Sequence, residues 1–153
     1  KTMQQAIFDT ILDGGEASEV GKIVRNHYEI MLNPDKTPSI DFGQPFGVKK
    51  AGTFAHKAAM WSNENIGTEI DLGDKPLIFF AKSGPKPLPN NRRIAIEWGD
   101  SPDDHDIVVD RLMSIETMFA NSNSFKAILG ALGTNWDRCV TGIGTTTLES
   151  WFE

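Results

Sequence analysis

Residues 76–81, PLIFFA, form an unbroken apolar run near the middle of the chain. A run of this length, with branched and aromatic side chains, is typical of a strand buried on both faces of a sheet. Residues 68–72 and 94–98 alternate between apolar and other positions, as half-buried strands do. We therefore expect a central, mostly antiparallel sheet built around residues 77–80.

Two helical patterns precede this sheet. Apolar residues recur on one face of residues 3–12, and Gly14 follows as a stop signal. A second pattern with a period of 3.6 residues runs through residues 18–32. Pro34 ends it, because proline lacks the backbone donor that a helix needs. We expect these two helices to form a hairpin with a shared apolar face.

Shorter segments complete the expected fold. Alternation over residues 38–48 predicts a strand or two short extended pieces, and residues 53–62 predict a short helix. Ser101-Pro102 is typical of a helix start, with a capping serine and a proline at the first helical position. The apolar stripe of that helix continues to residue 119.

The last part of the chain predicts one more helix and then extended structure. Ser124 is expected to cap a short helix, and the threonines of residues 135–153 favour one or two strands. The sequence thus predicts a single globular domain over residues 1–153 with an α+β fold. Its elements are two N-terminal helices, a central mostly antiparallel sheet, one or two later helices and a C-terminal strand.

Composition restricts the environment of the chain. The 153 residues include one cysteine, Cys139, so no intrachain disulfide can form, and a reducing, cytoplasmic compartment is expected. No apolar run approaches the roughly 20 residues of a membrane helix. Residues 1–13 are amphipathic, so they are not expected to be a signal peptide. The net charge of −6 disfavours nucleic acid and anionic membranes as general partners.

Motifs that carry catalysis or bind cofactors are missing from the sequence. It has neither a G-x-S-x-G elbow nor a phosphate-binding G-x-x-x-x-G-K-[ST] loop, and residues 142–145 lack the third glycine of a dinucleotide loop. His27, His56 and His105 match no zinc spacing. We therefore predict no catalytic residue, no metal site and no cofactor.

Charge is segregated along the chain. Residues 75–93 contain five basic residues and no acid, whereas residues 97–110 are rich in acids. The basic segment could be an ordinary solvated hairpin, a loop that contacts phosphates, or an interface that meets the acidic segment of a neighbouring copy. The acids could cap a helix or hold a magnesium or calcium ion. The candidate binding residues are Lys82, Lys86, Arg92, Arg93, Asp100, Asp103, Asp104 and Asp106.

The expected order is a first helix at residues 4–12, a strand hairpin at 77–98, a capped helix at 102–119 and a last strand at 145–153. In order and character these segments resemble the small tail-terminator and tail-completion proteins of long-tailed bacteriophages. It implies a ring-forming structural protein at the head-proximal end of a tail, without catalysis. No fingerprint residues match, so the resemblance assigns no functional residue.

The leading hypothesis is a non-enzymatic structural or assembly protein that forms homo-oligomeric contacts, in the host cytoplasm or the virion. Two other classes stay open. A small nucleic-acid-acting enzyme or toxin-like domain would use His56 with the basic residues of 49–57 and 82–93. An acidic inhibitor or immunity-type protein would cover a basic target with residues 100–110.

Overall fold

The computed structural model describes residues 3–141. Within that range the chain has six α-helices and a four-stranded antiparallel sheet, which confirms the α+β class. It divides into two compact units. We call residues 1–36 with 115–153 the helical unit, and Thr37–Ser114 the sheet unit. The expectation of a single domain stays a prediction.

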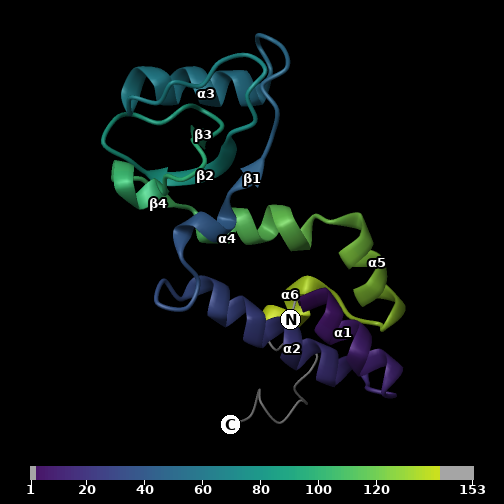
Figure 1. The fold of residues 1–153 in the computed structure, drawn as a ribbon. Coiled ribbons are helices and arrows are strands. Elements are labelled where there is room, and N and C mark those ends of the chain that lie inside the picture. The colour runs from purple at the N-terminus through teal and green to yellow at the C-terminus, as the bar shows by residue number, and fades with distance from the viewer. Residues whose placement is uncertain (1–2, 142–153) are drawn as a thin grey trace. The chain divides into compact units, whose positions relative to one another are not determined.

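The helical unit is built on the predicted helical hairpin. Helix α1 spans Met3–Leu12 and α2 spans Ala17–Leu32, as their apolar periods predict. The chain turns between them at Gly14, whose φ of +81° suits glycine. Helix α2 packs against α1 and also against α6, Trp136–Thr141. A π-helical turn, Glu116–Ala120, and helix α5, Asn123–Ala131, complete the described part of this unit (Figure 1).

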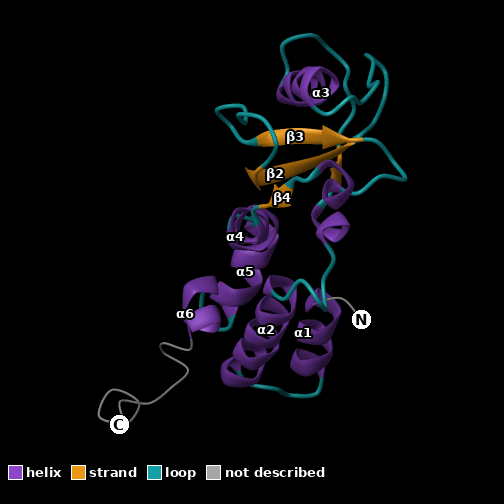
Figure 2. Cartoon of the chain, turned by 90° about the vertical axis from the view of Figure 1, so that its left-hand side faces the viewer, coloured by secondary structure: helices purple, strands orange, loops and turns teal. Residues whose placement is uncertain are grey.

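The sheet unit centres on strand β2, Leu77–Ser83, as the apolar run predicts. Strand β3, Arg93–Ile96, pairs with it antiparallel, with Leu77 opposite Ile96. Two short strands also pair with β2: β1, Gln44–Pro45, at its beginning and β4, Val108–Val109, at its end. Figure 2 shows β2 and β3 side by side and running in opposite directions.

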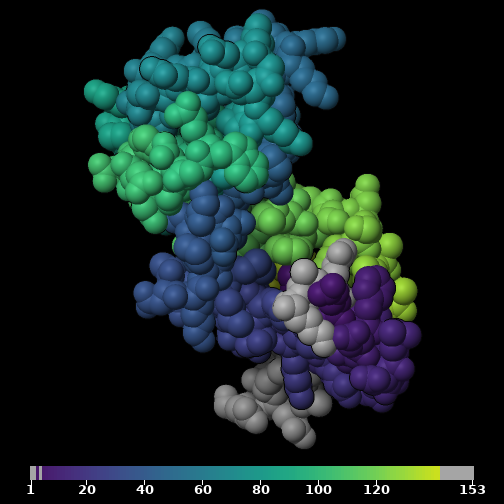
Figure 3. Space-filling view, viewed as in Figure 1, coloured from purple at the N-terminus to yellow at the C-terminus, as the bar shows by residue number. Residues whose placement is uncertain are grey.

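Both faces of this sheet are covered within the unit. Helix α3, Phe54–Asn65, packs on one face, where Ala55, Ala58 and Ala59 join Ile78 and Ala95 in a buried cluster. The small alanine side chains let the helix backbone approach the strands. Figure 3 shows the blue-green residues of this segment at the surface of the unit.

The opposite face of the sheet carries Phe79, Ile94 and Ile96, which are buried. Phe79 contacts Gly43, which follows a short 3-10 helix, Ser39–Phe42. A hydrophobic layer therefore lies on each side of β2, as its unbroken apolar run predicts.

The prediction of one long helix over residues 102–119 is wrong. The proline and the capping serine start only one 3-10 turn, Pro102–His105, which Asp106 ends with a left-handed backbone (φ 57°). The chain then forms β4, in which Val108 is exposed and Val109 is buried beside β2. Helix α4, Arg111–Ile115, begins only after this strand. Pairing with an existing strand thus overrides the local helical pattern.

Several smaller predictions need correction. Residues 38–48 were predicted as a strand or two short extended pieces; residues 39–42 form a 3-10 turn, and Gln44–Pro45 form the short strand β1. Residues 68–72 alternate in burial but form no ladder, because the Asn63 side chain binds Thr68 and Ile70 instead. Helix α5 is capped by Ser122 rather than by Ser124.

The prediction of strands over residues 135–153 is wrong for its described part. Residues 136–141 form helix α6, in which Trp136 and Cys139 are buried one turn apart. The remainder of the predicted C-terminal strand, and the glycines of residues 142–145, lie outside the described residues. Threonine content indicated a strand here, but the burial of these two side chains follows a helical spacing.

Candidate functional site

The basic residues of the β2–β3 hairpin gather around one hollow. Lys82, Lys86 and Arg92 line an open depression of about 630 Å³ together with the proline-rich loop between the strands. The lining contains no acidic residue. We call this the basic hairpin surface, and it comprises Lys82, Lys86 and Arg92 with Pro85, Pro87 and Pro89.

One hydrogen bond from helix α3 and one within the loop stabilise its conformation. The indole Nε1–H of Trp61, on helix α3, donates a hydrogen bond of 2.8 Å to the carbonyl oxygen of Pro87. The backbone N–H of Arg92 donates to the carbonyl oxygen of Pro89 at 2.9 Å, and Arg92 has a φ of 57°. The cations are therefore presented by a fixed turn that is anchored to a helix.

Arg93 does not belong to this surface, although the sequence grouped it with the other cations. Its guanidinium carbon lies 4.6 Å from the ring centre of Phe54 and 5.0 Å from that of Phe80. It stacks between α3 and β2 as a structural cation–π contact. The structure thus brings together three of the four predicted basic residues.

The four predicted acids have separate environments. Asp104 accepts a hydrogen bond from the Ser101 backbone in a capping box, and Asp103 accepts one from the Ser39 hydroxyl. Asp106 ends the 3-10 turn. Only Asp100 and Asp104 line a common hollow, of about 410 Å³.

Trp98 lies beside this hollow. The alternating pattern of residues 94–98 predicts that it belongs to a strand. Trp98 follows the end of β3 and its side chain is 65% exposed. Its Nε1–H donates a hydrogen bond of 2.6 Å to the carbonyl oxygen of Lys75, which fixes the orientation of the ring. Tryptophan is enriched at protein interfaces, because its ring offers apolar contact while its N–H finds a hydrogen-bond partner.

Trp98 stands between two hollows with acidic rims. One is the 410 Å³ hollow with Asp100 and Asp104, and the other, of about 200 Å³, is lined by Asp74 and Glu97. Lys75 is the basic residue in the lining of the smaller hollow. We call Trp98 with Asp74, Glu97, Asp100 and Asp104 the acidic tryptophan surface.

The histidines make local contacts. The His56 Nδ1 accepts a hydrogen bond from the Gly52 backbone N–H just before α3, and the His27 ring contacts the Ile23 carbonyl one turn earlier in α2. The His105 Nε2 lies 3.7 Å from a carboxylate oxygen of Asp100. Within residues 3–141 no three His, Cys, Asp or Glu side chains are grouped to hold a metal ion.

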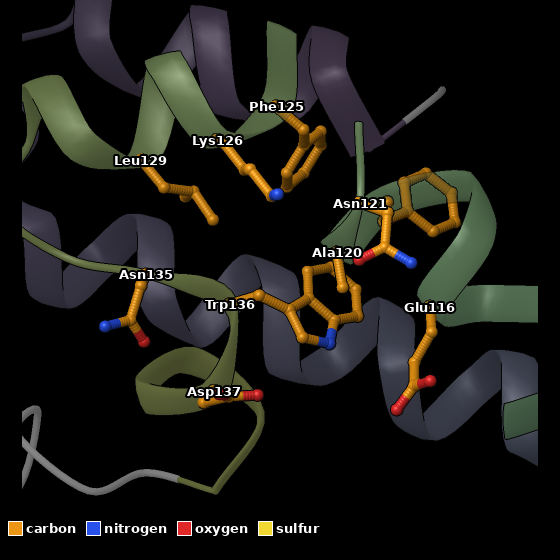
Figure 4. Close-up of a pocket in the computed structure, with 10 residues that line it drawn as sticks. Glu116, Ala120, Asn121, Phe125, Lys126, Leu129, Asn135, Trp136 and Asp137 are labelled. Atoms are coloured by element: carbon orange, nitrogen blue, oxygen red, sulfur yellow. The ribbon is translucent and has the colours of Figure 1, made fainter. Parts of the chain in front are cut away.

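The helical unit contains a separate aromatic pocket of about 470 Å³ (Figure 4). Phe119 and Trp136 stack nearly parallel with ring centres 5.7 Å apart, and Phe125 packs edge-on against both. Glu116 and Lys126 supply both signs of charge at its lining. The sequence pattern gave no sign of this pocket, because it placed Trp136 in a strand rather than one helical turn from Cys139.

Cys139 is buried, and in the sequence it follows Trp136 of this aromatic cluster by three residues. Burial raises the pKa of its thiol, and a contact with the Thr134 hydroxyl partly offsets that rise. A raised pKa keeps the sulfur protonated and poorly nucleophilic at neutral pH. The expectation of a core cysteine agrees with this environment.

No protein-family model matches the chain, and neither the curated proteins nor the solved structures contain a significant match to it. No helix among residues 3–141 is both long and apolar enough to cross a membrane.

Proposed function

We propose that the chain is a non-enzymatic assembly protein that associates with other copies of itself through its oppositely charged surfaces. The observation that supports this most directly is their position on one hairpin. The basic hairpin surface lies where β2 ends and β3 begins, and the acidic tryptophan surface lies where β3 ends and β2 begins.

Complementary charge at two ends of one unit favours a head-to-tail contact. Such a contact uses a different patch on each partner and generates a closed ring or an open filament. Charge complementarity mainly directs encounter and orientation, so it also makes association dependent on salt. A ring at the end of a bacteriophage tail, as the resemblance implies, is the setting that we propose for such a contact.

Analytical ultracentrifugation over a wide concentration range tests this function. We expect the weight-average mass to rise with concentration and to fall when NaCl is raised from about 0.1 M to about 1 M, because the Debye length then falls from about 10 Å to about 3 Å. The double variant Lys86→Glu/Arg92→Glu should stay monomeric at low salt.

A matched control changes the net charge equally elsewhere. Lys22 and Lys36 are exposed residues of the helical unit, so Lys22→Glu/Lys36→Glu should associate as the unaltered chain does. An unaltered chain that keeps the monomer mass at all concentrations and salt levels would contradict the proposed function.

A further inference from the structure

We propose that Trp98 of one copy docks into the hollow of the basic hairpin surface of a second copy. This inference rests on the proposed function and names the residue that anchors the contact. It requires a receptive hollow, an exposed anchor and a reason why the two meet between copies rather than within one.

Trp98 has the properties of an anchor. Its ring is 65% exposed, and the 2.6 Å hydrogen bond to the Lys75 carbonyl fixes it before any partner arrives. Tryptophan is enriched among the few interface residues that carry most of the binding free energy, and a side chain that is already oriented loses little entropy on docking. Hollows on both sides let a partner surround the ring.

The basic hairpin surface offers the matching chemistry. Its open hollow, of about 630 Å³, has room for an indole ring. The rings of Pro85, Pro87 and Pro89 give apolar contact, and the Arg92 guanidinium can stack on an indole face. The hydrogen bond from Trp61 to Pro87 holds this loop in place.

Charge complementarity supports the same pairing. Four carboxylates, those of Asp74, Glu97, Asp100 and Asp104, lie in the linings of the two hollows beside Trp98. They would approach Lys82, Lys86 and Arg92 as the ring enters the basic hollow. Apolar contact at the centre and ion pairs at the rim is the usual arrangement of a specific interface.

The two surfaces cannot meet within one chain. Strand β2 has seven residues and connects the two surfaces, and at about 3.3 Å per residue its ends lie about 20 Å apart. Both surfaces are fixed to the same pair of strands, so the loop cannot fold back to Trp98. A second copy is therefore the occupant that the chain itself supplies.

The first experiment compares Trp98→Ala with Leu72→Ala in analytical ultracentrifugation at low salt. Leu72 is also an exposed apolar residue of the sheet unit, at 58%. We expect Trp98→Ala to weaken association by about 30-fold or more, as loss of a hot-spot residue does, and Leu72→Ala to leave it unchanged. Circular dichroism and thermal unfolding verify that both variants fold.

The outcomes separate the two proposals. If the unaltered chain associates, and Lys86→Glu/Arg92→Glu abolishes this whereas Trp98→Ala does not, the proposed function stands and the docking of Trp98 is overturned. If the unaltered chain is monomeric under all conditions, the proposed function fails, and the inference fails with it.

A mixing experiment tests the head-to-tail geometry and does not depend on a loss of signal. Trp98→Ala keeps an intact basic hollow, and Lys86→Glu/Arg92→Glu keeps an intact Trp98. Each variant alone should be monomeric, and an equimolar mixture should form a heterodimer and no larger species. A mixture that stays monomeric overturns the arrangement.

A short DNA duplex provides the probe for a different occupant. Suppose the chain stays monomeric and binds the duplex, with binding lost in Lys86→Glu/Arg92→Glu and retained in Trp98→Ala. That result would assign the basic hollow to nucleic acid and overturn the docking of Trp98.

Discussion

The indole nitrogen of Trp61 lies 2.8 Å from the carbonyl oxygen of Pro87 and donates a hydrogen bond to it. One residue of helix α3 thereby holds the centre of the loop between β2 and β3, 26 positions further along the chain. The loop carries Lys86 next to this bond, so the contact sets where the cation is presented.

Replacing Trp61 by Phe removes this donor and keeps an aromatic ring. We expect the free energy of unfolding to fall by about 1 kcal/mol, the net value of a typical protein hydrogen bond. Urea denaturation measures this change, and hydrogen exchange should show faster exchange in residues 84–92. The control Met60→Ala alters an exposed neighbour on α3 and should leave loop exchange as it was. Unchanged exchange in Trp61→Phe would show that the loop is held by other contacts.

Adjacent arginines have different roles, which a pair of conservative variants can separate. Lysine keeps the charge of Arg93 but lacks the flat guanidinium that stacks between Phe54 and Phe80. We expect Arg93→Lys to lower the free energy of unfolding by about 0.5–1 kcal/mol, the value of a partly exposed cation–π contact. Arg92→Lys, at an exposed position, should have almost no effect. Equal urea midpoints for the two variants would contradict this assignment.

The approach of Gly43 to Phe79 leaves no space for a side chain. A β-carbon at Gly43 would lie 2.6 Å from the Phe79 ring, which is buried and cannot move aside. We expect Gly43→Ala to destabilise the chain by about 1–3 kcal/mol through overpacking. Gly47→Ala is the control, because its β-carbon would meet only the flexible Lys49 side chain, at 3.4 Å. Thermal unfolding should show a lowered midpoint for the first variant alone.

The buried thiol of Cys139 should react slowly with DTNB in the folded chain and rapidly after denaturation, because burial raises its pKa. The raised pKa also makes stability depend on pH. The folded chain keeps the thiol proton to higher pH than the unfolded chain, whose thiol has a pKa of about 8.5. The free energy of unfolding should therefore fall as pH rises above that value.

Cys139→Ala lacks this titration, so its stability should fall less steeply with pH than that of the unaltered chain. Rapid modification of the native thiol at neutral pH would contradict the burial of Cys139.

Local periodicity predicted the elements whose burial follows it. Helices α1 and α2 repeat apolar residues on one face, and the run at residues 76–81 is a strand buried on both sides. The predictions fail where pairing with a segment distant in the sequence determines the secondary structure. Val109 belongs to a strand because it lies opposite Ala81, and no pattern within residues 102–119 encodes that pairing.

In the candidate site, too, local sequence patterns predict some features, and distant contacts determine the others. The absence of acids from residues 75–93 is visible in the amino-acid order alone, and it predicted Lys82, Lys86 and Arg92 as binding residues together with Arg93, which stacks on Phe54 and Phe80 instead. Trp98 continues the alternation of Ile94 and Ile96, which are buried, and so gave no sign of its exposure. Its position depends on the end of β3 at Ile96 and on the bond to Lys75, which come from separate parts of the sequence.

The edges of the sheet have a consequence for aggregation. Two backbone donors of β3 are already engaged outside the β2 pairing, since the Ala95 N–H donates to the Ser62 hydroxyl and the Arg93 N–H to the Asn91 side chain. Along β2, the neighbouring strands β1 and β4 have only two residues each. Such short or covered edges give a foreign strand little backbone to extend, which protects against amyloid-like growth.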